Sequence, residues 1–189
     1  MVKHIVYIKG DVLKSDERII VHGCNCFNTM GSGIARQIRE RFPEAYAADI
    51  QTLYGDKTKL GRFTDALCEN AHGNPVHVIN AYTQYKYTRT EVDVDYDALK
   101  KVLTRVCLEF RNKTVALPKI GCGLAGGDWE VVEEIIESIG NKFNTTFHVY
   151  EWGEDSIERQ PKKSAEEAKA DNVRMLERFK ATLDKEYAR

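Results

Sequence analysis

The sequence predicts a single α/β domain in which helices pack against a mostly parallel or mixed sheet. Three observations lead to this prediction. Short apolar stretches typical of strands alternate along the chain with amphipathic stretches whose apolar residues recur every three or four positions. Glycine-rich turns stand at two places, each between a predicted strand and a predicted helix. The length of 189 residues suits one domain, or one domain with an appendage.

The first half of the chain contains four predicted strands and two predicted helices. The strands are expected at residues 4–8, 18–22, 62–68 and 75–81, and a dense turn sequence separates the last two. One helix follows the glycines at 31 and 33, because Ile34, Ile38 and Phe42 recur at every fourth position. Pro43 suits the first turn of the next helix, and Gly55 suits its end.

The second half repeats this alternation. Residues 97–110 form an amphipathic stretch with Leu99, Leu103 and Val106 on its apolar side, and a short apolar strand is expected at 114–117. Asp128 can cap a helix that continues through Ile139 and is stopped by Gly140. A last strand is expected at 145–150. Strands and helices in this order imply a layered α/β fold.

The character of the chain changes after Trp152, so we expect a domain at residues 1–152 and a charged linker and helix at 153–189. Ser164 and Glu167 form a capping box, and apolar residues then follow at helical spacing as far as Tyr187. This pattern predicts an amphipathic helix from about Ala165 to Tyr187 that packs on the domain. Dimerisation through this helix is an alternative, and we expect a monomer.

Composition excludes several classes of protein. The formal net charge of −1 provides no bulk electrostatic reason to expect nucleic acid or an anionic membrane as a partner. Apolar runs stay well below the roughly 20 residues that span a bilayer, and the start of the chain lacks a signal-peptide core, so we expect a cytoplasmic protein. Five cysteines without a Cys-x-x-Cys pair suggest reduced thiols, and we expect neither a metal nor a cofactor.

The two glycine-rich loops are the main functional signal. They lie at Gly31–Gly33 and at Gly121–Gly127. Glycine lets the backbone approach a ligand closely, and the helix that follows offers free N–H donors and the positive end of its dipole. Such loops can bind a diphosphate, whereas a pair of tight turns without a ligand is the alternative. The second loop also matches Gly-x-Gly-x-x-Gly, which keeps a nicotinamide-dinucleotide oxidoreductase as an alternative, although too little α/β pattern follows it.

Polar residues cluster near the first loop. His22 can serve as a general acid or base or as a hydrogen-bonded structural histidine. Asn25 can bind ribose hydroxyls or form a turn, and Asp11 can accept from an adenine amino group or cap a turn. Asn80 and Gln84 follow the fourth strand and are expected in the same cleft. A nucleophilic thiol at Cys122 is an alternative, which lacks a partner base other than His22.

Three motifs together resemble the macrodomain, a module that binds ADP-ribose. They are Tyr7–Asp11 (YIKGD), Val21–Ala35 (VHGCNCFNTMGSGIA) and Leu117–Trp129 (LPKIGCGLAGGDW). The resemblance extends from about residue 1 to Trp152. It implies a three-layer α/β/α sandwich with a mixed central sheet of about six strands, and such domains also occur in bacteriophages.

Within that family the sequence is similar to two groups. The yeast-type ADP-ribose-1″-phosphate phosphatases share the His-x-Cys-Asn-Cys segment, which begins at His22. The terminal ADP-ribose protein glycohydrolases share the Ile-Gly-Cys-Gly-Leu loop, but they carry a lysine and an aspartate where this chain has Gln84 and Ala125. The missing lysine argues against a covalent lysyl mechanism, and the presence of His22 favours the phosphatase.

The resemblance also implies a site. Asp11 meets the adenine amino group, Tyr150 or Trp152 flanks the adenine, and Asn25 holds the distal ribose. The expected ligand-binding residues are Gly10, Asp11, Val12, Asn25, Met30, Gly31, Ser32, Gly33, Ile34, Asn80, Gln84, Pro118, Ile120, Gly121, Cys122, Gly123, Leu124, Ala125 and Tyr150. The expected catalytic residues are His22, Asn25 and Asp128.

The implied ligands are ADP-ribose, ADP-ribose-1″-phosphate and ADP-ribosylated macromolecules. The implied activity is removal of phosphate from ADP-ribose-1″-phosphate. Removal of ADP-ribose from protein or nucleic acid, and binding of ADP-ribose without catalysis, are the alternatives.

Overall fold

The computed structural model describes residues 3–88 and 90–152, which form a six-stranded sheet covered by helices. The strands are β1 (Ile5–Lys9), β2 (Ile19–Cys24), β3 (Phe63–Glu69), β4 (Pro75–Tyr82), β5 (Val115–Pro118) and β6 (Phe147–Glu151). The helices are α1 (Gly33–Arg41), α2 (Pro43–Ile50), α3 (Tyr96–Glu109) and α4 (Trp129–Phe143), with short 3-10 helices η1 (Val12–Lys14) and η2 (Lys57–Lys59).

The strand order is β1-β6-β5-β2-β4-β3, and the sheet is mixed as predicted. Four of the five neighbouring pairs are parallel, and only β3 and β4 run antiparallel, joined by the turn predicted at residues 70–75. Parallel neighbours need crossover connections, which the helices provide. The carboxyl ends of β1, β2, β4, β5 and β6 therefore meet at one edge of the sheet.

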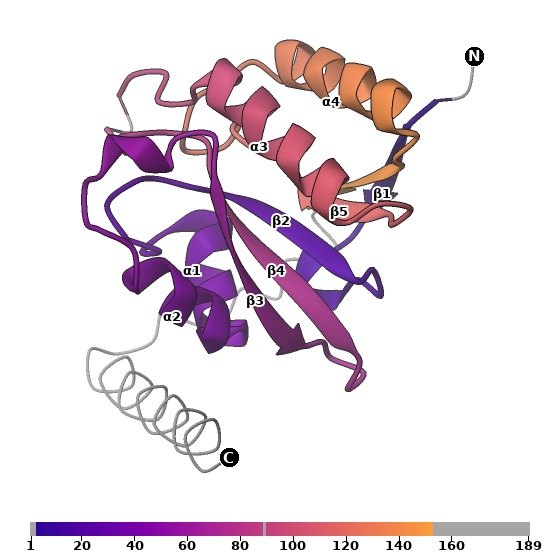
Figure 1. Ribbon diagram of the computed structural model, residues 1–189, viewed down its shortest axis with the longest axis horizontal. Helices are drawn as coiled ribbons and strands as arrows, with labels where there is room; N and C mark the ends of the chain where they lie inside the picture. Colours follow the sequence, from indigo (N-terminus) through magenta and orange to yellow (C-terminus); the bar gives the residue numbers. More distant parts are fainter. Residues whose placement is uncertain (1–2, 89, 153–189) are drawn as a thin grey trace. The chain divides into compact units, whose positions relative to one another are not determined.

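The helices cover both faces of the sheet and produce the expected three layers (Figure 1). Helices α1 and α2 pack on one face, and α3 and α4 pack on the other. Each face has its own core: Ile20, Ile38 and Val78 belong to the first, and Val21, Leu103 and Ile136 to the second. Both faces of β2 are buried, so every residue of this strand except Gly23 is buried.

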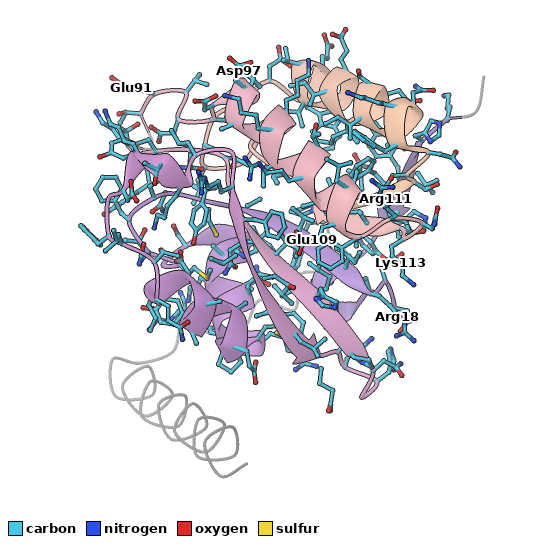
Figure 2. The ribbon with its side chains drawn as sticks, viewed as in Figure 1. Arg18, Glu91, Asp97, Glu109, Arg111 and Lys113 are labelled. Atoms are coloured by element: carbon cyan, nitrogen blue, oxygen red, sulfur yellow. The ribbon has the colours of Figure 1, made fainter. Side chains whose placement is uncertain are left out.

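Charged side chains of both signs are spread over the surface (Figure 2). Glu91 and Asp97 are exposed at the loop before α3 and in its first turn. Arg18, Arg111 and Lys113 are exposed elsewhere, near the start of β2 and after α3. No described helix is long and apolar enough to cross a membrane.

Two predicted helix ends are wrong. Helix α4 continues past Gly140 to Phe143 and ends at Asn144, whose φ of 50° is left-handed. Gly140 is present for packing, because a Cβ there would lie 2.4 Å from Cβ of His4. Helix α2 ends at Ile50, and Gly55, with φ of 70°, belongs to a later turn. The helix predicted at 165–187 lies outside the described residues.

Candidate ADP-ribose site

Both glycine-rich loops lie at the same edge of the sheet. The first connects the end of β2 to α1, and the second connects the end of β5 to α4. Because β2 and β5 are parallel neighbours, with Ile20 opposite Ala116, their carboxyl ends lie side by side. In open α/β sheets this edge is where ligands bind. The structure therefore brings the two predicted loops together.

A pocket of about 330 Å³ opens at this edge. It is lined by Gly10, Val12, Gly33, Ile34, Gln37, Pro118, Tyr150 and Trp152. Six of these residues are among the predicted ligand-binding set, and Trp152 is the predicted alternative to Tyr150. Gln37 was not predicted, although its position one turn after Ile34 on α1 indicates the same helix face. The pocket joins the ends of β1, β5 and β6 to the start of α1.

The two loops meet at Gly33 and Leu124. A Cβ atom built on Gly33 would lie 3.5 Å from Cδ1 of Leu124, and Leu124 is itself exposed. Gly33 has φ of 57°, a left-handed conformation that glycine adopts without strain, and it begins α1. The first N–H groups of a helix have no partner within the helix and attract anions. The mouth of the pocket thus has the geometry of a phosphate-binding loop.

The second loop is held in shape by its own backbone. The N–H of Gly127 donates to the carbonyl of Gly121 at 2.9 Å, and the carbonyl of Ala125 accepts from Asp93 at the same distance. A Cβ on Gly121 would lie 2.8 Å from a methyl carbon of Val94. Glycine is therefore required in this loop by packing as well as by access to a ligand.

Asp128 begins α4 and acts as its N-cap, as the sequence predicts. Its Oδ1 accepts from the N–H of Glu130 at 2.9 Å, and its own N–H donates to the Tyr96 hydroxyl at 2.8 Å. It is exposed and does not line the pocket. This geometry accounts for Asp128 as the N-cap of α4.

His22 lies in the core rather than in the cleft. Its side chain is completely buried, and its Nε2 lies 2.7 Å from Oδ1 of Asn80. Asn80 is also fully buried, and its Nδ2 donates to the Ala45 carbonyl at 2.7 Å and to the Thr64 hydroxyl at 2.9 Å. Burial lowers the pKa of His22 to about 4, so its imidazole is neutral near pH 7. The structure favours the structural role of His22 and removes both residues from direct ligand contact.

Two other predicted side chains make local turn bonds while remaining partly exposed. Asn25 accepts from the N–H of Phe27 and donates to the Thr29 hydroxyl, both at 2.8 Å. Oδ1 of Asp11 accepts from the N–H of Leu13 at 2.9 Å, which caps η1. An amide and a carboxylate each have hydrogen-bonding capacity beyond these bonds. Asn25 and Asp11 can therefore form a turn and bind a ligand at once.

Gln84, one of the predicted ligand-binding residues, makes local contacts. Its Nε2 donates to the Lys86 carbonyl at 2.6 Å, and its backbone forms an isolated bridge with Val94. Burial raises the pKa of the Cys122 thiol to about 11, so this thiol is protonated near pH 7 and a weak nucleophile. Within residues 3–88 and 90–152, no group of three His, Cys, Asp or Glu side chains could hold a metal ion.

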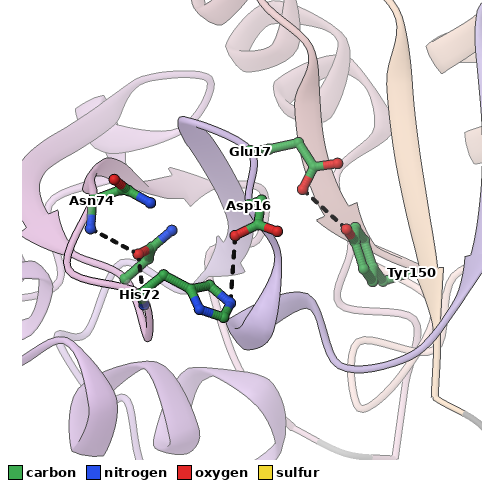
Figure 3. Close-up of polar contacts among 6 residues, drawn as sticks. Asp16, Glu17, His72, Asn74 and Tyr150 are labelled. Carbon is green, nitrogen blue, oxygen red and sulfur yellow. Dashed lines mark hydrogen bonds and ion pairs between the residues drawn. The ribbon is translucent and has the colours of Figure 1, made fainter.

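Tyr150, which lines the pocket, is hydrogen-bonded to the carboxylate of Glu17 (Figure 3). The Tyr150 hydroxyl donates to Oε2 of Glu17 at 3.0 Å, and Nδ1 of His148 contacts Oε1 of the same carboxylate. Burial alone would raise the pKa of Glu17, but the hydrogen bonds from His148, from its own backbone and from Tyr150 lower it. Burial and the Glu17 carboxylate raise the pKa of Tyr150. Tyr150 therefore presents a neutral, oriented ring to the pocket.

A largely buried network of polar side chains, not predicted from the sequence, holds Asn28, which lies in the segment between β2 and α1 that contains the first loop. Asn28 has φ of 53° and donates from Nδ2 to the carbonyls of Asp49 and Thr52, each at 3.0 Å. Lys59 is 6% exposed, and its Nζ donates to Oδ1 of Asn28 and to the Thr52 hydroxyl. The Tyr82 hydroxyl donates to Asp49 at 2.8 Å. The sequence around Lys59 is polar and contains no pattern from which the burial of this lysine could be predicted.

Comparison with known proteins agrees with this geometry. The Macro domain family matches residues 21–136. An uncharacterised 17.5 kDa protein of Enterobacteria phage T4 is 35% identical over 145 residues, which is 73% of this chain and 91% of that protein. The DNA ADP-ribosyl glycohydrolase of Mycobacterium tuberculosis is 35% identical over 135 residues, which is 71% of this chain and 38% of the longer relative.

An ADP-ribose 1″-phosphate phosphatase of Saccharomyces cerevisiae is 27% identical over 178 residues, covering 77% of this chain and 98% of the relative. Among solved structures, the macrodomain of Mycobacterium tuberculosis DarG has a TM-score of 0.65 at 28% identity, and the match covers 79% of this chain and 98% of that one. The sheet order, the loops and these matches agree. The chain belongs to the Macro domain family.

Proposed function

We propose that this protein binds ADP-ribose across the two glycine-rich loops and hydrolyses an ADP-ribose derivative at C1″ of the distal ribose. The observation that carries the proposal is the meeting of Gly33 and Leu124 at the mouth of the pocket. Adenosine fits the part lined by Tyr150 and Trp152, and the diphosphate lies along the start of α1. The distal ribose then reaches Asn25.

Positioning of the substrate accounts for most of the proposed catalysis. Of the predicted catalytic residues, His22 is buried and Asp128 does not line the pocket. The Cys122 thiol, the alternative nucleophile, is protonated near pH 7. A water molecule held beside C1″ forms the new C–O bond, the bond from C1″ to the leaving group breaks, and the leaving group takes the proton that water loses. Positioning the water and C1″ in this way lowers the activation barrier even when no side chain acts as a base on the water.

We favour a nucleic-acid strand as the leaving group. The burial of His22 removes the argument that favoured phosphate. Two Mycobacterium relatives named DNA ADP-ribosyl glycohydrolase are 35% identical to this chain, and one from Thermus aquaticus is 27% identical. The phosphatases are 26–27% identical. Gln84 at the lysine position supports attack by water rather than by a lysine side chain.

Phosphate is the second candidate. The match covers 98% of the length of the yeast phosphatase but 38% of the length of the glycohydrolase.

One experiment separates the candidates. ADP-ribosylated single-stranded DNA, ADP-ribose-1″-phosphate, O-acetyl-ADP-ribose and ADP-ribosylated protein are incubated side by side, and the products are resolved by chromatography. We expect free ADP-ribose and the unmodified strand from the first substrate. Release of phosphate at a higher rate would select the second candidate. If the protein binds ADP-ribose but converts none of the four substrates, it is a binding module without catalytic activity.

A further inference from the structure

Four aromatic side chains form a partly exposed cluster beside the first loop, which we call the aromatic patch. It consists of Phe27, Tyr54, Tyr85 and Tyr87. The Phe27 ring is central, with centroid distances of 5.3 Å to Tyr54, 5.0 Å to Tyr85 and 6.1 Å to Tyr87. Tyr54 is 70% exposed and Tyr87 is 47% exposed. Gathered aromatic surface of this kind marks an interaction site.

The patch is a built structure, because hydrogen bonds join the three chain segments that supply it. The N–H of Gly55 donates to the Cys26 carbonyl at 2.8 Å, and the N–H of Cys26 donates to the Tyr85 carbonyl at 3.2 Å. The Tyr85 hydroxyl donates to the Gly55 carbonyl at 3.2 Å. A Cβ on Gly55 would lie 3.3 Å from the Phe27 ring, so glycine allows the close contact.

The position of the patch connects it to the proposed reaction. Phe27 lies two residues after Asn25. The turn between them is closed by a hydrogen bond from the N–H of Phe27 to the Asn25 side chain. Tyr85 follows Gln84 directly. Under the proposed function the distal ribose lies at Asn25, so a group attached to C1″ would lie close to Phe27, the central ring of the patch.

The charges around the patch suit a phosphate backbone. Nζ of Lys57 lies 5.0 Å from the Tyr85 ring centroid, and Lys86 is exposed between Tyr85 and Tyr87. The neighbouring carboxylate of Asp56 is engaged by the N–H of Thr58 at 2.8 Å and by its hydroxyl at 2.7 Å. Exposed aromatic faces interleaved with lysines are the features that bind single strands, whose bases stack on the rings.

We propose that the aromatic patch stacks the bases of a single-stranded nucleic acid that carries the ADP-ribosyl group. This proposal rests on the proposed function for the attached ADP-ribose, but strand binding itself does not require it. Since the formal net charge is only −1 and few lysines line the patch, stacking rather than bulk charge dominates recognition. Two phosphate contacts predict a slope of about −1.4 for log affinity against log salt concentration.

The test measures fluorescence anisotropy of a labelled, unmodified oligothymidylate with the full chain. The double variant Tyr54→Ala/Tyr87→Ala should weaken strand binding by about 5- to 100-fold, the effect of losing base–aromatic stacking. Tyr54→Phe/Tyr87→Phe keeps the ring faces and should bind within about twofold of the unaltered protein. Leu53→Ala is the matched control, because Leu53 is 74% exposed beside Tyr54 but has no ring. ADP-ribose affinity, measured by calorimetry, should be unchanged in all three variants.

The outcomes separate this proposal from the proposed function. Equal strand affinity in the double alanine variant, or an equal loss in Leu53→Ala, would overturn the stacking proposal. So would a change in sedimentation of the double variant without a change in strand affinity, which would identify a second copy as the occupant. Failure of the unaltered protein to bind ADP-ribose would instead overturn the proposed function and would leave the strand-binding result standing on its own.

Discussion

A methyl group on Gly33 would be in van der Waals contact with Leu124, at 3.5 Å from its Cδ1 atom, so the two glycine-rich loops approach each other closely at these two residues. A diphosphate in this position would have loop backbone on two sides. The predictions below follow from this arrangement and from the buried groups around it.

Gly33→Glu should abolish ADP-ribose binding, because its carboxylate would lie where the diphosphate passes and would repel it. Any side chain at this position also costs about 1–2 kcal/mol, since φ of 57° is left-handed. Gly33→Ala shares that cost without the charge and is the control. Calorimetry should show a loss of at least about 100-fold, or 2.7 kcal/mol, for glutamate alone. Equal losses in the two variants would attribute the effect to backbone strain.

Replacing His22 should lower stability and leave the protonation steps of turnover unchanged. His22→Ala removes the bond to Asn80 and leaves a buried oxygen unpaired, which costs about 1–3 kcal/mol before any cavity term. Chemical denaturation measures this loss. The pH–rate profile should keep the same limbs in a variant that remains folded, and disappearance of a limb would return His22 to the mechanism.

The same residue predicts a pH dependence of stability. The pKa of His22 is about 4 in the folded protein and about 6.5 when unfolded, so the unfolded state binds the extra proton first as pH falls. The contribution of His22 to the free energy of unfolding is nearly complete above pH 6.5 and is lost between pH 6.5 and 4. The loss between pH 7 and pH 5 is about 2 kcal/mol. The difference between unaltered protein and His22→Gln, measured across this range by denaturant titration, should show this slope. A flat difference would mean that His22 is accessible to water.

Tyr150 should contribute to binding through its ring more than through its hydroxyl. Tyr150→Phe keeps the pocket wall and loses only the bond to Glu17, so ADP-ribose affinity should fall by less than about threefold, or 0.7 kcal/mol. Tyr150→Ala should weaken ADP-ribose and AMP by the same factor of about ten, because both contain adenine. A loss confined to ADP-ribose would place Tyr150 near the distal ribose instead.

Lys59→Met should destabilise the first loop. Its ammonium is bonded to Asn28 and Thr52, and methionine would leave both oxygens buried without this partner, a cost of about 1–3 kcal/mol for each. Melting temperature and ADP-ribose affinity should fall together. Lys57→Met, two residues earlier and exposed, is the matched control and should change neither. Loss of stability with unchanged affinity would show that the loop keeps its shape without the lysine.

The order of strands and helices could be predicted because most elements have a clear period. The position of the two glycine-rich loops beside each other could also be predicted, since the carboxyl ends of parallel strands lie at the same edge of the sheet. The face of the sheet on which His22 lies could not be predicted. Strand β2 is buried on both faces, so its sequence does not alternate between apolar and polar residues and gives no sign of which side chains point to which face. The sequence predicts Gly140 as a helix stop, yet the structure shows that Gly140 permits close packing against His4, a residue 136 positions earlier in the chain.

The strand order has a consequence for how the protein forms. Strand β1 precedes the other described strands in the chain, but it lies at the edge of the described sheet, where it pairs with β6, the last described strand. During translation β1 must wait, unpaired, until residue 151 has left the ribosome. Pairing across so many residues is slow. An N-terminal fusion would therefore interfere with the last step of sheet assembly rather than the first.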